Sequence, residues 1–148
     1  IGVTILLHAD LAYADDSALF QIPFVSLGLS PEGAASQLLV QQAGYHKAAE
    51  LLFTAKKFNS QTALEVGLIN AISKDVYAEA EQQAKILAAL PLASLQQTKQ
   101  LMKHNLAQII ECIDHEAEIF MQRVASPEMS EAISAFMQKR PANFSQFN

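Results

Sequence analysis

The sequence predicts an α/β protein whose second half is entirely helical. Three short runs rich in strand-forming residues, at residues 10–14, 18–22 and 68–73, all fall in the first half of the chain. From residue 75 onward the pattern is helical throughout. With 51% apolar and 17% charged residues, the 148-residue chain has the composition of a soluble globular protein that can bury a core.

The first half predicts short strands followed by short helices. Residues 1–9 are apolar almost throughout and predict a buried helix or a buried strand, because periodicity does not distinguish the two. Turn formers separate the runs 10–14 and 18–22, and Pro23 confines the second run to an edge or an end of a sheet. Helix signals follow in three segments, the last of which begins at Ser60 as its cap: residues 31–42, 45–54 and 60–66.

The second half predicts four helices joined by short turns. Pro91 ends the first helix and serves as the first-turn proline of the second. The last helix is predicted to begin with Ser126 as its cap, followed by Pro127 and the acidic Glu128 in the first turn, and to end near Arg140. The predicted helices cover residues 75–90, 91–105, 107–124 and 127–140.

The segment FVSLGLSPEGAASQ, residues 24–37, carries a candidate functional carboxylate. Ser30 can cap a helix, Pro31 suits its first position, and Glu32 then lies near the positive end of the helix dipole. Small residues follow, so little bulk stands beside the carboxylate. By this pattern alone an ordinary helix start explains the segment, and a catalytic role for Glu32 is the alternative.

Composition argues against several classes of function. The net charge is −5 and no basic block is present, which argues against nucleic-acid binding through a general electrostatic patch. No apolar run reaches the length of a membrane span. The four histidines are scattered, so no metal site is predicted. The single cysteine, Cys112, lies among isoleucines, which predicts a buried inert thiol and fits a reducing, cytoplasmic compartment.

Three segments, in order along the chain, resemble the crotonase superfamily of enoyl-CoA hydratases and isomerases. They are IGVTILLHADLAYADDSALFQIPFVSLGLSPEGAAS, TAKKFNSQTALEVGLIN and EMSEAISAFMQKRPANF. The resemblance implies that residues 1–73 are the C-terminal part of the family's ββα-spiral core and that residues 74–148 are its helical oligomerisation region. The family's chains are longer, and this one resembles their C-terminal half. We therefore expect the 148 residues by themselves to fold poorly and to be inactive.

Within the family, the resemblance favours the Δ3,Δ2-enoyl-CoA isomerases over the hydratases. Hydratases use two glutamates, and the matching positions here hold Thr4 and Phe24. The isomerases place one glutamate in a turn that resembles Ser30 to Gly33, which makes Glu32 the implied catalytic base. The implied reaction moves the double bond of a 3-enoyl-CoA to the 2-position in fatty acid β-oxidation, by proton transfer through this one carboxylate.

The resemblance also implies the surroundings of that base. The backbone N–H of Ile1 corresponds to one donor of the family's oxyanion hole, and the second donor belongs to a segment outside this chain. Phe24, Leu27 and Leu29 are plausible walls of an apolar substrate pocket, in which desolvation makes a carboxylate a stronger base.

Further partners follow from the resemblance alone. Phe136 and Lys139 match a Phe and a Lys that, in many members, contact the coenzyme A bound by a neighbouring subunit; a core Phe and an exposed Lys are the alternative. A homotrimer or a dimer of trimers is implied, with an acyl-CoA thioester as substrate. No separate cofactor is implied, because coenzyme A is part of the substrate, and no nucleic acid or membrane partner is expected.

Two other functions stay open. The chain could belong to an enoyl-CoA hydratase or to an enzyme of another crotonase-fold reaction, although positions 4 and 24 lack carboxylates. It could also belong to a non-catalytic member that binds acyl-CoA or another protein, although Glu32 is retained.

Overall fold

Four two-residue strands form two small sheets in the first half of the chain. The computed structural model describes residues 1–147. In it, β1 (Tyr13–Ala14) pairs in parallel with β4 (Ala71–Ile72), with Tyr13 opposite Ala71. Strand β2 (Leu19–Phe20) pairs antiparallel with β3 (Phe58–Asn59), with Leu19 opposite Asn59. The three predicted runs therefore contain strands, each shorter than predicted, and β3 was not predicted.

Short helices pack around these strands and enclose the core. The second α-helix begins and ends where the sequence predicts, and it buries the predicted Ala48, Leu51 and Leu52. These side chains join a cluster that includes Leu39, which is fully buried. The helical elements of this half are η1 (Thr4–His8), η2 (Val25–Leu27), α1 (Ala35–Ala43), α2 (Tyr45–Thr54) and α3 (Ser60–Glu65).

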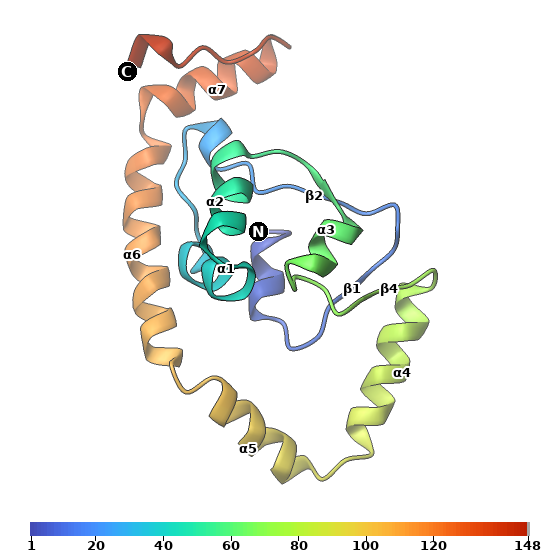
Figure 1. Cartoon of the computed structure of the whole chain (residues 1–148). Helices are drawn as coiled ribbons and strands as arrows, with labels where there is room; N and C mark the ends of the chain where they lie inside the picture. The colour runs from blue at the N-terminus through green and yellow to red at the C-terminus, as the bar shows by residue number, and fades with distance from the viewer. Residues whose placement is uncertain (148) are drawn as a thin grey trace.

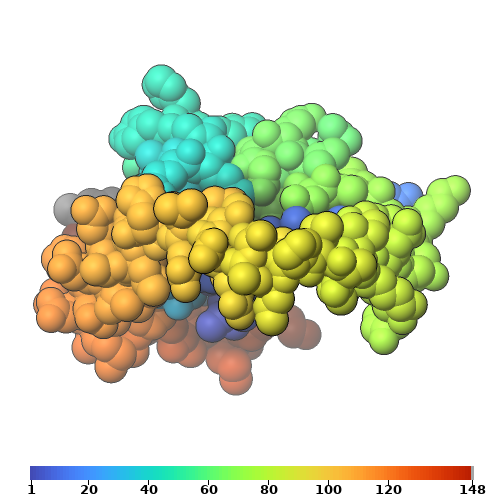
Figure 2. All heavy atoms as spheres, turned by 90° about the horizontal axis from the view of Figure 1, so that it is seen from below, coloured from blue at the N-terminus to red at the C-terminus, as the bar shows by residue number. Residues whose placement is uncertain are grey.

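The helices of the second half run around this core instead of forming a bundle of their own (Figure 1). They are α4 (Val76–Ala88), α5 (Leu92–Met102), α6 (Leu106–Val124), α7 (Pro127–Met137) and η3 (Ser145–Phe147). Figure 2 shows α4, α5 and α6 as a continuous band across the lower face. The Asp75 and Ser126 side chains accept hydrogen bonds from the backbone N–H groups of Ala78 and Met129, and so cap α4 and α7.

The fold is therefore mixed α/β up to β4 and helical beyond it, as predicted. The division into residues 1–73 and 74–148 as structural regions stays a prediction. Within residues 1–147, no helix combines the length and the apolar content that crossing a bilayer requires.

The predicted helix start at Ser30 is wrong. Gly33 and Ala34 both adopt left-handed backbone conformations, with φ of 74° and 58°, and α1 begins only at Ala35. The chain therefore turns sharply before the helix, and Glu32 lies in this turn instead of in a first helical turn. The Ser30 hydroxyl is buried without a partner among the described residues and caps nothing.

Other predicted elements differ from the structure at their ends. Asn59, not Ser60, caps α3 by accepting from the N–H of Thr62, while the Ser60 hydroxyl donates to the carbonyl of Asp15. The apolar residues 1–9 contain the 3₁₀ helix η1, in which Thr4 is the one fully buried residue. Val3, Leu6 and Leu7 are half-buried against the core, whereas Ile1 and Ile5 are exposed, so the predicted burial is wrong for these two. Helix α5 ends at Met102 and α7 at Met137, each three residues before its predicted end.

Candidate active site

The turn that carries Glu32 is held by η1. Two successive left-handed residues, Gly33 and Ala34, point the Glu32 side chain back towards the start of the chain. The His8 ring donates from Nε2 to the carbonyl oxygen of Gly33 at 2.7 Å. Because a carbonyl oxygen can only accept, this contact requires the proton on Nε2. The pairing fixes η1 against the turn.

The Glu32 carboxylate meets the start of the same 3₁₀ helix. Its Oε1 accepts a hydrogen bond from the Thr4 hydroxyl at 2.9 Å and lies 3.8 Å from the backbone nitrogen of Ile1. The Glu32 side chain is 29% exposed, while Thr4 is buried. Two segments that the sequence separates by 28 residues therefore place a carboxylate, a hydroxyl and a backbone nitrogen together.

An open cavity of about 320 Å³ lies over this carboxylate. Among residues 1–147, Glu32 is the only one with an ionisable side chain that lines this cavity. The rings of Phe24 and Phe120 close one side, edge to face, with centroids 6.4 Å apart. A carboxylate beside an otherwise apolar wall can accept a proton from a bound molecule that excludes water. The cavity is lined by Ile1, Phe24, Glu32, Ala117, Phe120 and Met121.

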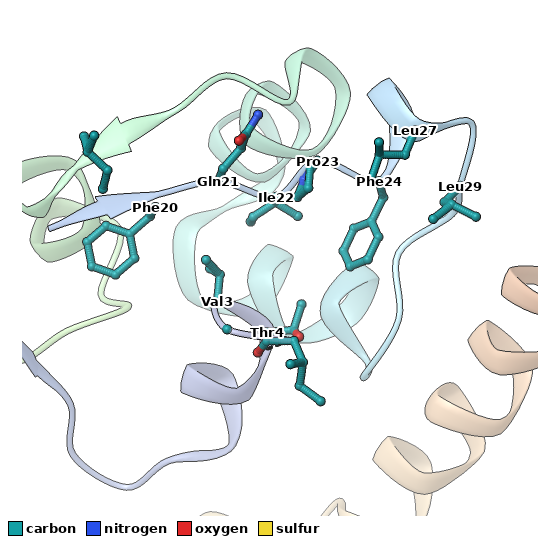
Figure 3. A pocket seen from close by; sticks show the side chains of 12 residues that line it. Val3, Thr4, Phe20, Gln21, Ile22, Pro23, Phe24, Leu27 and Leu29 are labelled. Atoms are coloured by element: carbon teal, nitrogen blue, oxygen red, sulfur yellow. Dashed lines mark hydrogen bonds between the residues drawn. The ribbon is translucent and has the colours of Figure 1, made fainter. Parts of the chain in front are cut away.

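A second cavity, of about 580 Å³, adjoins the first. Ile1 and Phe24 line both, so the two spaces meet at these residues. Figure 3 shows Val3 and Thr4, at the start of η1, on one side of the second cavity and the segment from Phe20 to Phe24 on the other. Leu27 and Leu29, predicted as pocket walls, also line it. The structure thus brings Ile1, Phe24 and Glu32 together and puts Leu27 and Leu29 in the adjoining space.

Phe136 and Lys139 lie apart from both cavities. Phe136, on α7, is 80% exposed, and Lys139, just beyond the helix, is exposed with a left-handed φ of 53°. Neither residue lines either cavity. The alternative of a core Phe is wrong, and the alternative of an exposed Lys is confirmed. Their predicted contact with coenzyme A on a neighbouring subunit stays a prediction.

Helix α6 supplies the wall residues that sequence reasoning missed. Ala117, Phe120 and Met121 are spaced as residues i, i+3 and i+4, which places them on one face of the helix. That spacing was visible in the sequence. The sequence did not show that this face covers Glu32, since the two segments lie far apart along the chain.

Within residues 1–147, no three His, Cys, Asp or Glu side chains gather as a metal site would require. Cys112 is half-buried, less than predicted, and burial raises the pKa of its thiol. A raised pKa disfavours the thiolate, which is the nucleophilic form.

Comparisons with known proteins agree on one family. Residues 1–147 match the family model described as enoyl-CoA hydratase/isomerase. The chain is 33% identical, over 144 residues, to enoyl-CoA delta isomerase 2 of Rattus norvegicus, covering 95% of this chain and 37% of the rat protein. It is 28% identical to the 2,3-dehydroadipyl-CoA hydratase of Escherichia coli over 147 residues, covering 97% of this chain and 57% of that protein.

Solved structures show the same likeness. A putative enoyl-CoA hydratase/isomerase from Acinetobacter baumannii is 78% identical, with a TM-score of 0.87, over 88% of this chain and 56% of that one. An enoyl-CoA hydratase/isomerase from Pseudoalteromonas atlantica is 34% identical, with a TM-score of 0.93, over 97% of this chain and 59% of that one. The chain thus spans less than two thirds of the length of these relatives.

Proposed function

The chain belongs to the enoyl-CoA hydratase/isomerase family of enzymes, and on that premise we propose that its protein is a Δ3,Δ2-enoyl-CoA isomerase. In this proposal it converts a 3-enoyl-CoA to the 2-enoyl-CoA, and Glu32 is the only proton-transfer group. The observation that carries the proposal is the cavity over Glu32, whose wall holds this one carboxylate among apolar side chains.

One carboxylate is sufficient for the chemistry. The proton on the carbon between the thioester carbonyl and the double bond is acidic. Glu32 removes it, and the electron pair of that C–H bond delocalises into a dienolate. The dienolate then takes the same proton back two carbons along, which leaves the double bond conjugated with the carbonyl. Nothing is oxidised or reduced, and no water is consumed.

The dienolate oxygen needs hydrogen-bond donors while it carries charge. The Ile1 nitrogen lies 3.8 Å from Glu32 Oε1, so a thioester oxygen bound by its N–H would hold the acidic carbon close to the carboxylate. Ile1 and Phe24 line both cavities, which gives an acyl chain a continuous apolar path. Leu27 and Leu29 would contact this chain in the larger cavity.

Hydration is less well supported. A two-acid mechanism needs a second carboxylate, and Thr4 and Phe24 stand at the two positions where the hydratases resembled here carry their acids. Both residues lie at the Glu32 site, and neither side chain can act as a carboxylate.

The proposal extends to partners that lie beyond this chain. Phe136 and Lys139 are exposed, so both are accessible to the coenzyme A of a neighbouring subunit, with Lys139 pairing with a phosphate. A homotrimer or a dimer of trimers in the cytoplasm, acting in fatty acid β-oxidation, completes the proposal.

The test is the turnover of a 3-enoyl-CoA by the natural-length protein that contains this chain. Glu32→Gln keeps the shape of the side chain and removes the base, so the rate should fall about a hundred- to ten-thousandfold. Glu111→Gln, an exposed change on α6, is the matched control and should leave the rate unchanged. Undiminished isomerisation by Glu32→Gln would refute the proposal. Hydration of a 2-enoyl-CoA as the main reaction would favour a hydratase, and thioester binding without turnover a non-catalytic member.

A further inference from the structure

Thr4 is the residue that directly contacts the Glu32 carboxylate from the first turn of η1. Its side chain is buried, with the residue only 4% exposed. The hydroxyl lies 2.9 Å from Glu32 Oε1 and 3.3 Å from the carbonyl oxygen of Ile1. A threonine hydroxyl has one proton to donate, so these two acceptors compete for it.

The carboxylate is the stronger acceptor. It is the nearer of the two, and hydrogen bonds to an ionised acceptor are shorter and stronger than those to a neutral carbonyl. The hydroxyl proton is therefore directed at Glu32. The Cβ of Thr4 also lies 3.7 Å from the position that a Cβ on Gly33 would occupy, so Thr4 packs against the Glu32 turn as well as bonding to its side chain.

We propose that Thr4 is a positioning residue for Glu32: its hydroxyl holds Oε1 and leaves Oε2 as the oxygen that takes and returns the proton. Within residues 1–147, Oε1 receives the Thr4 bond and Oε2 receives none. An oxygen that already accepts a hydrogen bond has a lone pair committed, whereas the free oxygen can approach the substrate carbon without losing a partner. This inference rests on the proposed function.

Position 4 would then have a role different from that of an acid. A glutamate there would bring a second negative charge beside Glu32, whereas the hydroxyl of Thr4 brings a donor. The donor fixes the orientation of a flexible side chain, and fixed orientation is what a single carboxylate needs to serve two carbons of one substrate.

Two substitutions at position 4 test the proposal in the natural-length protein. Thr4→Val keeps the branched shape and removes the donor, while Thr4→Ser keeps the donor. We expect Thr4→Val to lower kcat for a 3-enoyl-CoA about tenfold with little change in KM, since orientation and not binding is lost. Thr4→Ser should keep most of the kcat of the wild type. Thr54→Val, which removes a hydroxyl that donates to the Glu50 carbonyl on α2, is the matched control and should leave kcat unchanged.

Crystal structures of wild type and Thr4→Val supply a readout that does not depend on turnover. The wild type should keep one Glu32 conformer bonded to Thr4, and the variant should release Oε1 into alternative conformers. An unchanged kcat in Thr4→Val, equal losses in Thr4→Val and Thr4→Ser, or an undisturbed Glu32 in the variant would each overturn the proposal. A wild-type protein that holds Glu32 through Thr4 but does not isomerise 3-enoyl-CoAs would refute the proposed function while supporting the positioning role.

Discussion

Glu116, in the middle of α6, accepts a hydrogen bond at 2.9 Å from the backbone N–H of Ser36, which lies 80 residues earlier at the start of α1. Helix α1 has Ala34 at its N-cap and therefore no side-chain acceptor of its own there. The buried carboxylate of Glu116 takes that role, at the end of the helix where the dipole favours a negative charge. One bond thus caps α1 and fastens α6 to the core.

Removing this carboxylate should loosen α6. Glu116→Leu leaves the Ser36 N–H without its acceptor, and we expect the free energy of unfolding to fall by about 2 kcal/mol. Glu116→Gln keeps an acceptor oxygen and should cost less. Urea denaturation of the natural-length protein measures both, with Glu118→Leu, an exposed change on the same helix, as the control. Equal stabilities of Glu116→Leu and wild type would contradict the capping role.

Phe120 should matter for activity more than for the fold. Its ring meets Phe24 edge to face and forms a wall of the Glu32 cavity. Phe120→Ala opens this wall to water, so kcat/KM for a 3-enoyl-CoA should fall about tenfold or more. Phe53→Ala, which truncates an exposed ring on α2, should leave kcat/KM unchanged. Unchanged kinetics of Phe120→Ala would show that α6 does not bound the substrate site.

The elements that local sequence determines were predictable. Helix α2 has both its ends and its buried face where the pattern predicts, because a glycine precedes it and apolar residues follow the helical repeat. Asp75 and Ser126 begin helices close to the predicted residues, because each side chain caps the first turn of its helix. Ser30, Pro31 and Glu32 satisfy the same local rules and yet start no helix. The Thr4 and His8 bonds to this turn come from a distant segment and outweigh the local preference.

The site was predictable only in part, for a related reason. Resemblance to a family led to Glu32, Ile1 and Phe24, which do line one cavity. The contribution of α6 depends on contacts such as that between Glu116 and Ser36, which no local pattern encodes. The length of each strand also depends on tertiary contacts, because a strand extends only as far as it pairs with its partner, and each pairing covers two residues.

Gly28 should tolerate no side chain. Its φ is +70°, and a Cβ there would lie 2.8 Å from the Cβ of Glu128 and 2.9 Å from the nitrogen of Met129. Arg123 donates to the Gly28 carbonyl at 2.9 Å, which holds the loop against α6 and α7. Gly28→Ala combines backbone strain with a clash against main-chain atoms, so the free energy of unfolding should fall by about 2 kcal/mol or more.

Thermal or urea denaturation of the natural-length protein checks this. Gly28 has a ψ of 17° and so lies in the left-handed helical region, where the backbone strain of an alanine alone costs roughly 1–2 kcal/mol. A loss for Gly28→Ala no larger than this strain would show that α7 is free to move away from the loop.

The segment after α7 should be anchored in a pH-dependent way. Glu131 accepts two hydrogen bonds from the Arg140 guanidinium, at 2.5 and 2.9 Å, and one from the Asn143 N–H at 2.8 Å. The Arg140 guanidinium, and then the Asn143 N–H, lower the pKa of Glu131 from 4.5 to about 2. Because the folded pKa lies below the ordinary value, the stabilisation is complete above pH 4.5 and is lost as the pH falls towards 2.

The chemical shift of the Asn143 amide reports this titration directly. In the natural-length protein its midpoint should lie near pH 2. Arg140→Gln removes the larger cause, so the midpoint should move up towards 4.5 but stop short of it, since the Asn143 bond remains. Lys139→Gln removes a neighbouring charge that makes no bond to Glu131 among residues 1–147 and should leave the midpoint in place. An Asn143 titration that Arg140→Gln does not shift would show that the ion pair does not anchor this segment.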